Sequence, residues 1–179
     1  MKKKTLLLCS YFVGCILVFL AIFFTVAHFV FAYYEADKTF RKEGLSITLT
    51  RDFKEKANDE DYTAYYYAHN MGVWTYKTEF SLFDASWGAE NRSCEEYAEL
   101  IKNDYKTIYE STSDLFIDNG LIYFTFDTMS KTTESRYFVS AYKSKDAFWL
   151  VLIGCEKAAY EKGLQEDVIA YAQSVVWEE

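Results

Sequence analysis

The stretch Ala147–Cys155 reads AFWLVLIGC and is the most apolar run outside the N-terminal segment. It shows little alternation of apolar and polar residues, which is typical of a strand covered on both faces of a sheet. The sequence therefore predicts a central strand here, with other elements on both sides of it.

Further strands are predicted on either side of a mid-domain helix. Leu45–Thr50 alternates apolar and small polar residues, and Asp118-Asn119-Gly120 is a strong hairpin signal because Asn and Gly tolerate positive φ. The remaining predicted strands are rich in β-branched and aromatic residues or precede the hairpin signal. They are Tyr62–Ala68, Val73–Phe83, Leu115–Ile117, Leu121–Met129 and Arg136–Tyr142.

Two helices are predicted in the same region. Ser93 followed by Glu96 is a capping-box signature, and apolar residues then recur at steps of three and four as far as Glu110. The closing segment 156–174 has a similar stripe, although Gly163 weakens it. The predicted fold class is α+β: a mainly antiparallel sheet flanked by two helices.

The N-terminal segment Leu6–Ala32 contains 27 consecutive uncharged residues. This length predicts a transmembrane helix, since the hydrocarbon layer of a bilayer is about 30 Å thick. Two alternatives are a cleaved secretory signal and lipidation at Cys15, where FVGC resembles a lipobox. Lys2–Lys4 favour a cytoplasmic N-terminus, so residues 1–34 are expected to form the tail and single-pass anchor in the cell membrane, and 35–179 one extracytoplasmic domain.

Composition excludes some classes of protein. The chain is 51% hydrophobic and 20% aromatic, which argues against disorder. Its formal charge is −8, and residues 35–179 carry 16 basic against 27 acidic side chains. Such a charge argues against nucleic-acid binding.

Few residues suggest catalysis or metal binding. His69 lies near a predicted turn without a nucleophile motif, and Asp59, Glu60 and Asp61 lack the spacing of an EF-hand. Cys94 and Cys155 are either joined in a disulfide or are two buried free thiols. The sequence thus predicts no catalytic residue, no cofactor and no metal.

A cluster of aromatic residues is the candidate binding surface. Strand alternation places Tyr65 and Tyr67 on one face and Tyr66 on the other, and Trp74 follows in the next strand. Tyr and Trp are favoured at binding surfaces, but core packing together with β propensity is the simpler explanation of these residues.

Several segments together resemble the PsbP-like α/β/α sandwich family over residues 40–177. They are GLSITLTRDF at Gly44–Phe53, the helix with Tyr97, FWLV at Phe148–Val151 and the closing helix into Ser174-Val175-Val176. Small bacterial members of this fold stand outside the membrane behind an N-terminal anchor. The resemblance implies a non-enzymatic accessory role that supports a membrane or envelope protein complex. The alternatives are a sensory module that binds a small molecule or glycan, and an envelope hydrolase with dispersed catalytic residues.

Overall fold

A computed structural model describes residues 2–57 and 62–177; the side chains of 2–15, 17, 34 and 35 are outside its described part. The chain divides into two compact units, residues 1–37 and 38–179. The acidic residues Asp59–Asp61 therefore lie outside the described residues, as does the side chain of Cys15.

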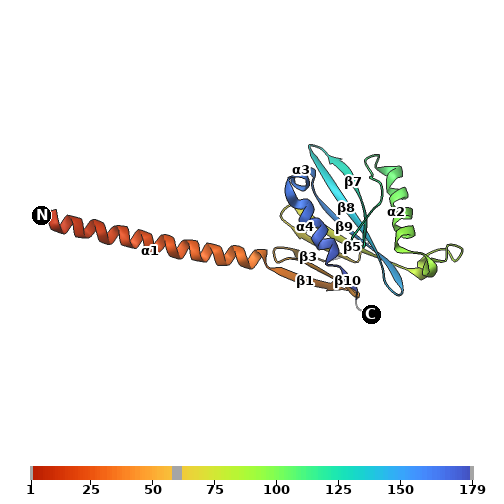
Figure 1. The fold of residues 1–179 in the computed structure, drawn as a ribbon, viewed down its shortest axis with the longest axis horizontal. Coiled ribbons are helices and arrows are strands. Elements are labelled where there is room, and N and C mark those ends of the chain that lie inside the picture. Colours follow the sequence, from red (N-terminus) through yellow and green to blue (C-terminus); the bar gives the residue numbers. More distant parts are fainter. Residues whose placement is uncertain (1, 58–61, 178–179) are drawn as a thin grey trace. The chain divides into compact units, whose positions relative to one another are not determined.

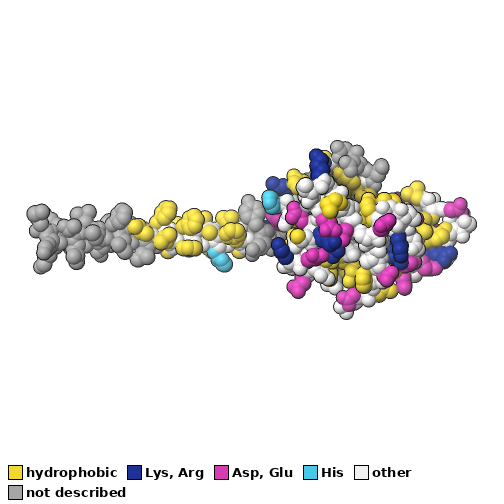
Figure 2. Space-filling view, turned by 90° about the horizontal axis from the view of Figure 1, so that it is seen from above, with side chains coloured by type: hydrophobic (Ala, Val, Ile, Leu, Met, Phe, Trp, Pro, Cys, Tyr) yellow, Lys and Arg dark blue, Asp and Glu magenta, His cyan; other side chains and the backbone are white. Residues whose placement is uncertain are grey.

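The first unit is built on one long helix, α1 (Lys2–Glu35). The described side chains along it are almost all hydrophobic (Figure 2). Among the described residues, no helix combines the length and the apolarity that a membrane crossing requires.

The second unit contains a seven-stranded sheet in the order β3-β4-β5-β9-β8-β7-β6 (Figure 1). All six neighbouring pairs are antiparallel, which confirms the predicted type of sheet. The strands are β3 (Lys54–Lys56), β4 (Ala64–Ala68), β5 (Met71–Glu79), β6 (Phe116–Asp118), β7 (Leu121–Ser130), β8 (Thr133–Lys143) and β9 (Ala147–Glu156). The central strand β9 is buried from Ala147 to Cys155, as its unbroken apolar sequence predicts.

One face of this sheet packs against helix α2 (Cys94–Ile108). Ser93 caps the helix: its Oγ accepts from the backbone N–H of Glu96 at 3.1 Å, and Glu96 accepts from the backbone N–H of Ser93 at 2.8 Å. The predicted capping box is confirmed, and the helix ends at Ile108 rather than Glu110. Two short 3₁₀ turns, η1 (Phe80–Leu82) and η2 (Ala89–Asn91), lie between β5 and α2.

The other face is covered by a second sheet and by the C-terminal helix (Figure 1). This sheet has the order β1-β2-β10, with β1 (Asp37–Lys42), β2 (Leu45–Thr50) and β10 (Val176–Trp177). Strand β2 has the predicted bounds, whereas β1, β3 and β10 were not predicted. Ser174 joins this layer together, because its Oγ accepts from the backbone N–H of Thr48 and donates to the carbonyl of the same residue.

The C-terminal helix is interrupted, where the sequence predicts one continuous helix. It consists of α3 (Lys157–Ala159), a π-helical turn η3 (Tyr160–Leu164) and α4 (Gln165–Gln173). Gly163 has φ of 139°, a conformation that side-chain-bearing residues rarely adopt. The glycine therefore breaks the helix, rather than only weakening it.

Candidate functional site

Five aromatic side chains form a row across the sheet, beside and at the end of α2. We name Tyr65, Trp74, Tyr137, Phe126 and Tyr109 the aromatic row. The ring centroids of Tyr65 and Trp74 are 4.8 Å apart with 10° between the planes. Tyr137 and Phe126 are stacked at 4.9 Å and 7°, and Phe126 and Tyr109 at 4.5 Å and 22°. The two stacks meet where Trp74 and Tyr137 lie 6.0 Å apart.

The spacing of the row follows from strand pairing. Tyr65 of β4 is directly opposite Trp74 of β5, and Phe126 of β7 is directly opposite Tyr137 of β8. Opposite residues in antiparallel strands point to the same face and are separated by about 5 Å, which suits parallel ring stacking. In each stacked pair the rings therefore cover one face of each other, and Phe126 is buried while the other four rings of the row are partly exposed.

Two glycines make room for the rings to lean over the sheet. A Cβ on Gly72 would come within 2.5 Å of the Trp74 ring. A Cβ on Gly154 would come within 2.6 Å of the Tyr137 ring and 3.2 Å of the Trp74 ring. Gly154 pairs with Gly72 on one side and with Tyr137 on the other, so at this position strand β9 places no side chain between Gly72 and Tyr137.

We expect Gly154→Ala to lower the free energy of unfolding by about 1 kcal/mol, because the added methyl group must displace both rings. The cost is at the low end for overpacking because Trp74 and Tyr137 are only partly buried and can tilt outward. Chemical denaturation measures the change, and near-UV circular dichroism reports the altered ring stacking. Unchanged stability together with an unchanged near-UV spectrum would contradict the close approach.

The predicted binding residues divide between the two faces as alternation requires. Tyr65, Tyr67 and Trp74 share the face of the aromatic row, and Tyr67 is 41% exposed. Tyr66 is only 1% exposed and packs on the opposite face, with its ring 4.7 Å from that of Phe40. Tyr66 therefore belongs to the core and not to the candidate binding surface.

Sequence reasoning missed Tyr137, Phe126 and Tyr109, which come from distant elements. Burial, and after it the neighbouring Tyr76 and Tyr109, raise the pKa of Tyr105, beside the row, to about 12. Burial also raises the pKa of Tyr137. These phenols stay neutral at physiological pH, so the surface combines apolar ring edges with uncharged hydroxyl groups.

Two lysines border this surface at the edge strand β3. Lys54 lies opposite Tyr67 and Lys56 opposite Tyr65, and both lysines are exposed. The Lys56 ammonium is 6.0 Å from the centre of the Tyr65 ring. The border of the surface at β3 is thus basic, although the domain as a whole is acidic.

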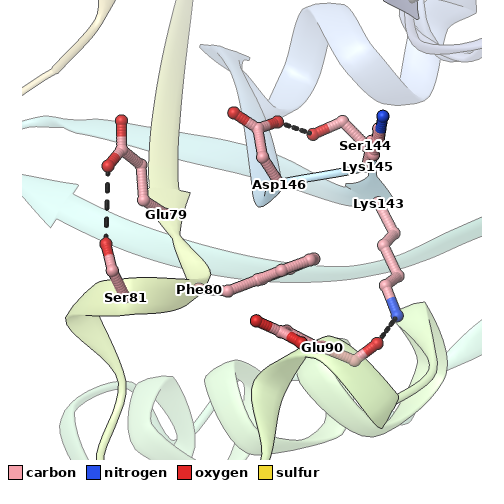
Figure 3. A pocket seen from close by; sticks show the side chains of 8 residues that line it. All are labelled: Glu79, Phe80, Ser81, Glu90, Lys143, Ser144, Lys145 and Asp146. Atoms are coloured by element: carbon pink, nitrogen blue, oxygen red, sulfur yellow. Dashed lines mark hydrogen bonds between the residues drawn. The ribbon is translucent and has the colours of Figure 1, made fainter.

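An open hollow of about 680 Å³ lies away from the row, at the turn between β8 and β9 (Figure 3). Its lining includes Glu79, Glu90, Lys143 and Asp146. Lys143 donates to the backbone carbonyls of Glu90 and Arg92 at 2.7 Å each. These bonds give Lys143 a structural role, since they tie the segment before α2 to strand β8.

The two cysteines of the domain are free thiols on opposite faces of the seven-stranded sheet. Cys94 begins α2 and packs with the residues under that helix, whereas Cys155 is buried beneath the second sheet and the C-terminal helix. Burial raises the pKa of the Cys94 thiol to about 12. The disulfide alternative is therefore not the arrangement in this structure, because the sheet separates the two sulfur atoms.

His69 is exposed in the turn between β4 and β5. Among the described residues there is no group of three His, Cys, Asp or Glu side chains arranged to hold a metal ion.

Comparisons with known proteins show a likeness in fold. No family model and no curated protein sequence matches the chain. Cyanobacterial PsbP (CyanoP) from Synechocystis sp. PCC 6803, solved in solution, aligns with a TM-score of 0.56 at 5% identity, over 80% of this chain and 94% of that one. A crystal structure from Bacteroides thetaiotaomicron VPI-5482 aligns with a TM-score of 0.54 at 13% identity; the match covers 79% of this chain and about half (48%) of that one. The likeness to CyanoP, together with the two-sided covering of the antiparallel sheet, shows that residues 38–179 adopt a PsbP-like fold.

Proposed function

We propose that this protein is a membrane-anchored, non-catalytic accessory protein whose domain docks a protein partner through the aromatic row and Tyr67. The single observation that carries the proposal is the partly exposed pair of Tyr65 and Trp74 beside Tyr67, which is 41% exposed, at the end of a row whose Phe126 is buried against α2. The PsbP-like fold supports an accessory role, and α1 would supply the anchor.

The ring geometry favours a protein partner over a glycan. Binding to a flat sugar requires an exposed ring face, whereas the rings of Tyr65 and Trp74 lie parallel and cover each other. Tyr and Trp are enriched among the few residues that carry most of the binding energy in protein interfaces. The lining of the open hollow is mainly charged and polar, with Phe80 as its aromatic residue, so it does not favour the sensory alternative.

The uncharged run at residues 6–32 supports the anchor, which would place the N-terminus in the cytoplasm and the domain outside. We expect the full chain to stay with membranes after carbonate extraction. Protease added to intact cells should digest a C-terminal tag. Release by carbonate, or a tag protected until the cells are lysed, would contradict the anchor and its orientation.

A photo-reactive residue in place of Tyr67 tests the docking surface in the full chain. We expect ultraviolet light on native membranes to produce one discrete adduct from this position. Phe116, which is 46% exposed on the edge strand β6, is the matched control and should give no such adduct. Equal adducts at both positions, or none at 67, would contradict the docking role.

Substitution of the same residues measures how much they contribute to partner binding. Tyr65→Ala and Tyr67→Ala together should reduce the yield of the adducted partner several-fold, measured by a cross-linker that does not depend on position 67. The double variant keeps Trp74, so the sheet retains its larger ring there. An undiminished yield would place the partner elsewhere on the domain.

A further inference from the structure

Charge is distributed unevenly over the domain. Residues 38–56 contain six Lys or Arg against three Asp or Glu, whereas residues 57–179 contain 10 against 22. The acidic residues 59–61 are counted with the second group and lie outside the described residues. A net charge of +3 is thus confined to a short segment that begins three residues after α1 ends.

This segment forms one flank of the domain. Strand β1 is the edge of the three-stranded sheet and β3 is the edge of the seven-stranded sheet. The two edges lie next to each other: Lys42 Nζ is 3.3 Å from Glu55 Oε1, and the ring of Phe40 in β1 packs on that of Tyr66. We name the exposed Lys38, Lys54 and Lys56, together with Lys42, the basic flank.

We infer that the basic flank binds the anionic headgroups of the bilayer that holds α1; this inference rests on the proposed anchoring. Lys and Arg close to a membrane-spanning segment are attracted to anionic lipid over about one Debye length. Within an otherwise acidic domain, the flank is the surface whose charge complements lipid phosphates. Because Lys54 and Lys56 border Tyr67 and Tyr65, headgroup binding would set the aromatic row close to the membrane surface.

Lysine footprinting of the full chain in proteoliposomes tests the inference. An amine-reactive, membrane-impermeant reagent is applied in vesicles of phosphatidylcholine alone and in vesicles that contain 30% phosphatidylglycerol. We expect the anionic lipid to slow labelling of Lys38, Lys54 and Lys56 by about fivefold. The exposed Lys145 and Lys162 serve as internal controls and should react at the same rate in both. In 0.5 M salt the difference should disappear.

Charge reversal gives a matched comparison. The variant Lys38→Glu/Lys54→Glu/Lys56→Glu keeps Lys42, whose labelling rate reports on the flank. In this variant the labelling rate of Lys42 should be the same in both kinds of vesicle. The control Lys106→Glu/Lys145→Glu/Lys162→Glu changes the net charge by the same amount and should preserve the dependence.

Three outcomes separate the possibilities. A chain that fails to float with either kind of vesicle contradicts the anchor itself. A chain that floats with both but shows equal labelling of the flank overturns only the present inference. Inorganic phosphate at 10 mM is the third arm: the same protection without vesicles would show a site for small phosphates and would also overturn it.

Discussion

Replacing Phe148 by alanine is expected to lower the free energy of unfolding by about 4 kcal/mol, close to the limit for a single core truncation. Phe148 is 0% exposed on the central strand β9. Its ring stacks on that of Tyr97 at 4.4 Å and 12°, and meets Phe80 at 5.1 Å and Phe83 at 5.8 Å. Removing it would leave a cavity lined by the rings of Tyr97, Phe80 and Phe83, which the surrounding residues can close only in part.

Phe116→Ala is the matched control for this prediction. It deletes the same atoms from a position that is 46% exposed, so a loss of about 1 kcal/mol or less is expected. Urea denaturation of both variants measures the difference. Similar losses for the two substitutions would show that Phe148 does not hold α2 against the sheet.

Asp127→Asn is expected to cost about 2 kcal/mol at pH 7. Asp127 accepts two hydrogen bonds from Arg136, at 2.7 and 2.9 Å, and Lys157 Nζ lies 2.9 Å away. Lys157 also contacts Glu134 at 2.7 Å, so the cluster joins the β7–β8 hairpin to the start of the C-terminal helix. Breaking a fully buried ion pair costs more, but solvent screens the partly exposed Arg136 and Lys157.

The pH dependence of the same substitution is a separate prediction. Hydrogen bonds from Arg136, and then Lys157, hold the pKa of Asp127 below its ordinary value. A lowered folded-state pKa stabilises the protein above the ordinary carboxyl pKa, and this stabilisation is lost as pH falls through the folded value. The difference between wild type and Asp127→Asn should therefore be full at pH 7 and shrink below about pH 4. A gap that widens on acidification would contradict the ion network.

Asp104→Asn provides the control. Asp104 is exposed on α2, so its substitution should change stability by about 0.5 kcal/mol or less at either pH. Equal losses for Asp127→Asn and Asp104→Asn would show that the change reflects net charge rather than a specific contact.

The elements that could be predicted are those with a local signal. Ser93 and Glu96 fix the start of α2 by their own hydrogen bonds. Asn119 and Gly120 both have positive φ, at 49° and 83°, and they form the hairpin that their types predict. The apolar run of β9 needs no partner to be recognised.

The missed elements depend on distant partners. Strand β1 reads DKTFRK and β3 reads KEK, so neither has an apolar alternation. They are strands because β2 and β4 offer them hydrogen bonds, and their charges are typical of sheet edges that avoid aggregation. The strand signal of β2 could not reveal that it belongs to a second sheet.

The candidate site was predictable only where its residues carry a local signal. Alternation separated Tyr65 and Tyr67 from Tyr66, which is a local property of a strand. That Tyr137 and Phe126 join Tyr65 and Trp74 in one row depends on the pairing of β5 with β9, which are far apart in sequence. The glycines under the rings were the available signal, because Gly154 interrupts an otherwise bulky apolar run.

The closure of the second sheet has a consequence for biosynthesis. The backbone of Thr48 is held by Ser174, 126 residues further along the chain, and β2 gains its partner β10 only after that. While the polypeptide leaves the ribosome, Leu45–Thr50 therefore has no complete layer to join. Strands β1 and β2 therefore stay exposed until nearly the whole domain has been translated. This half of the core folds after synthesis rather than during it.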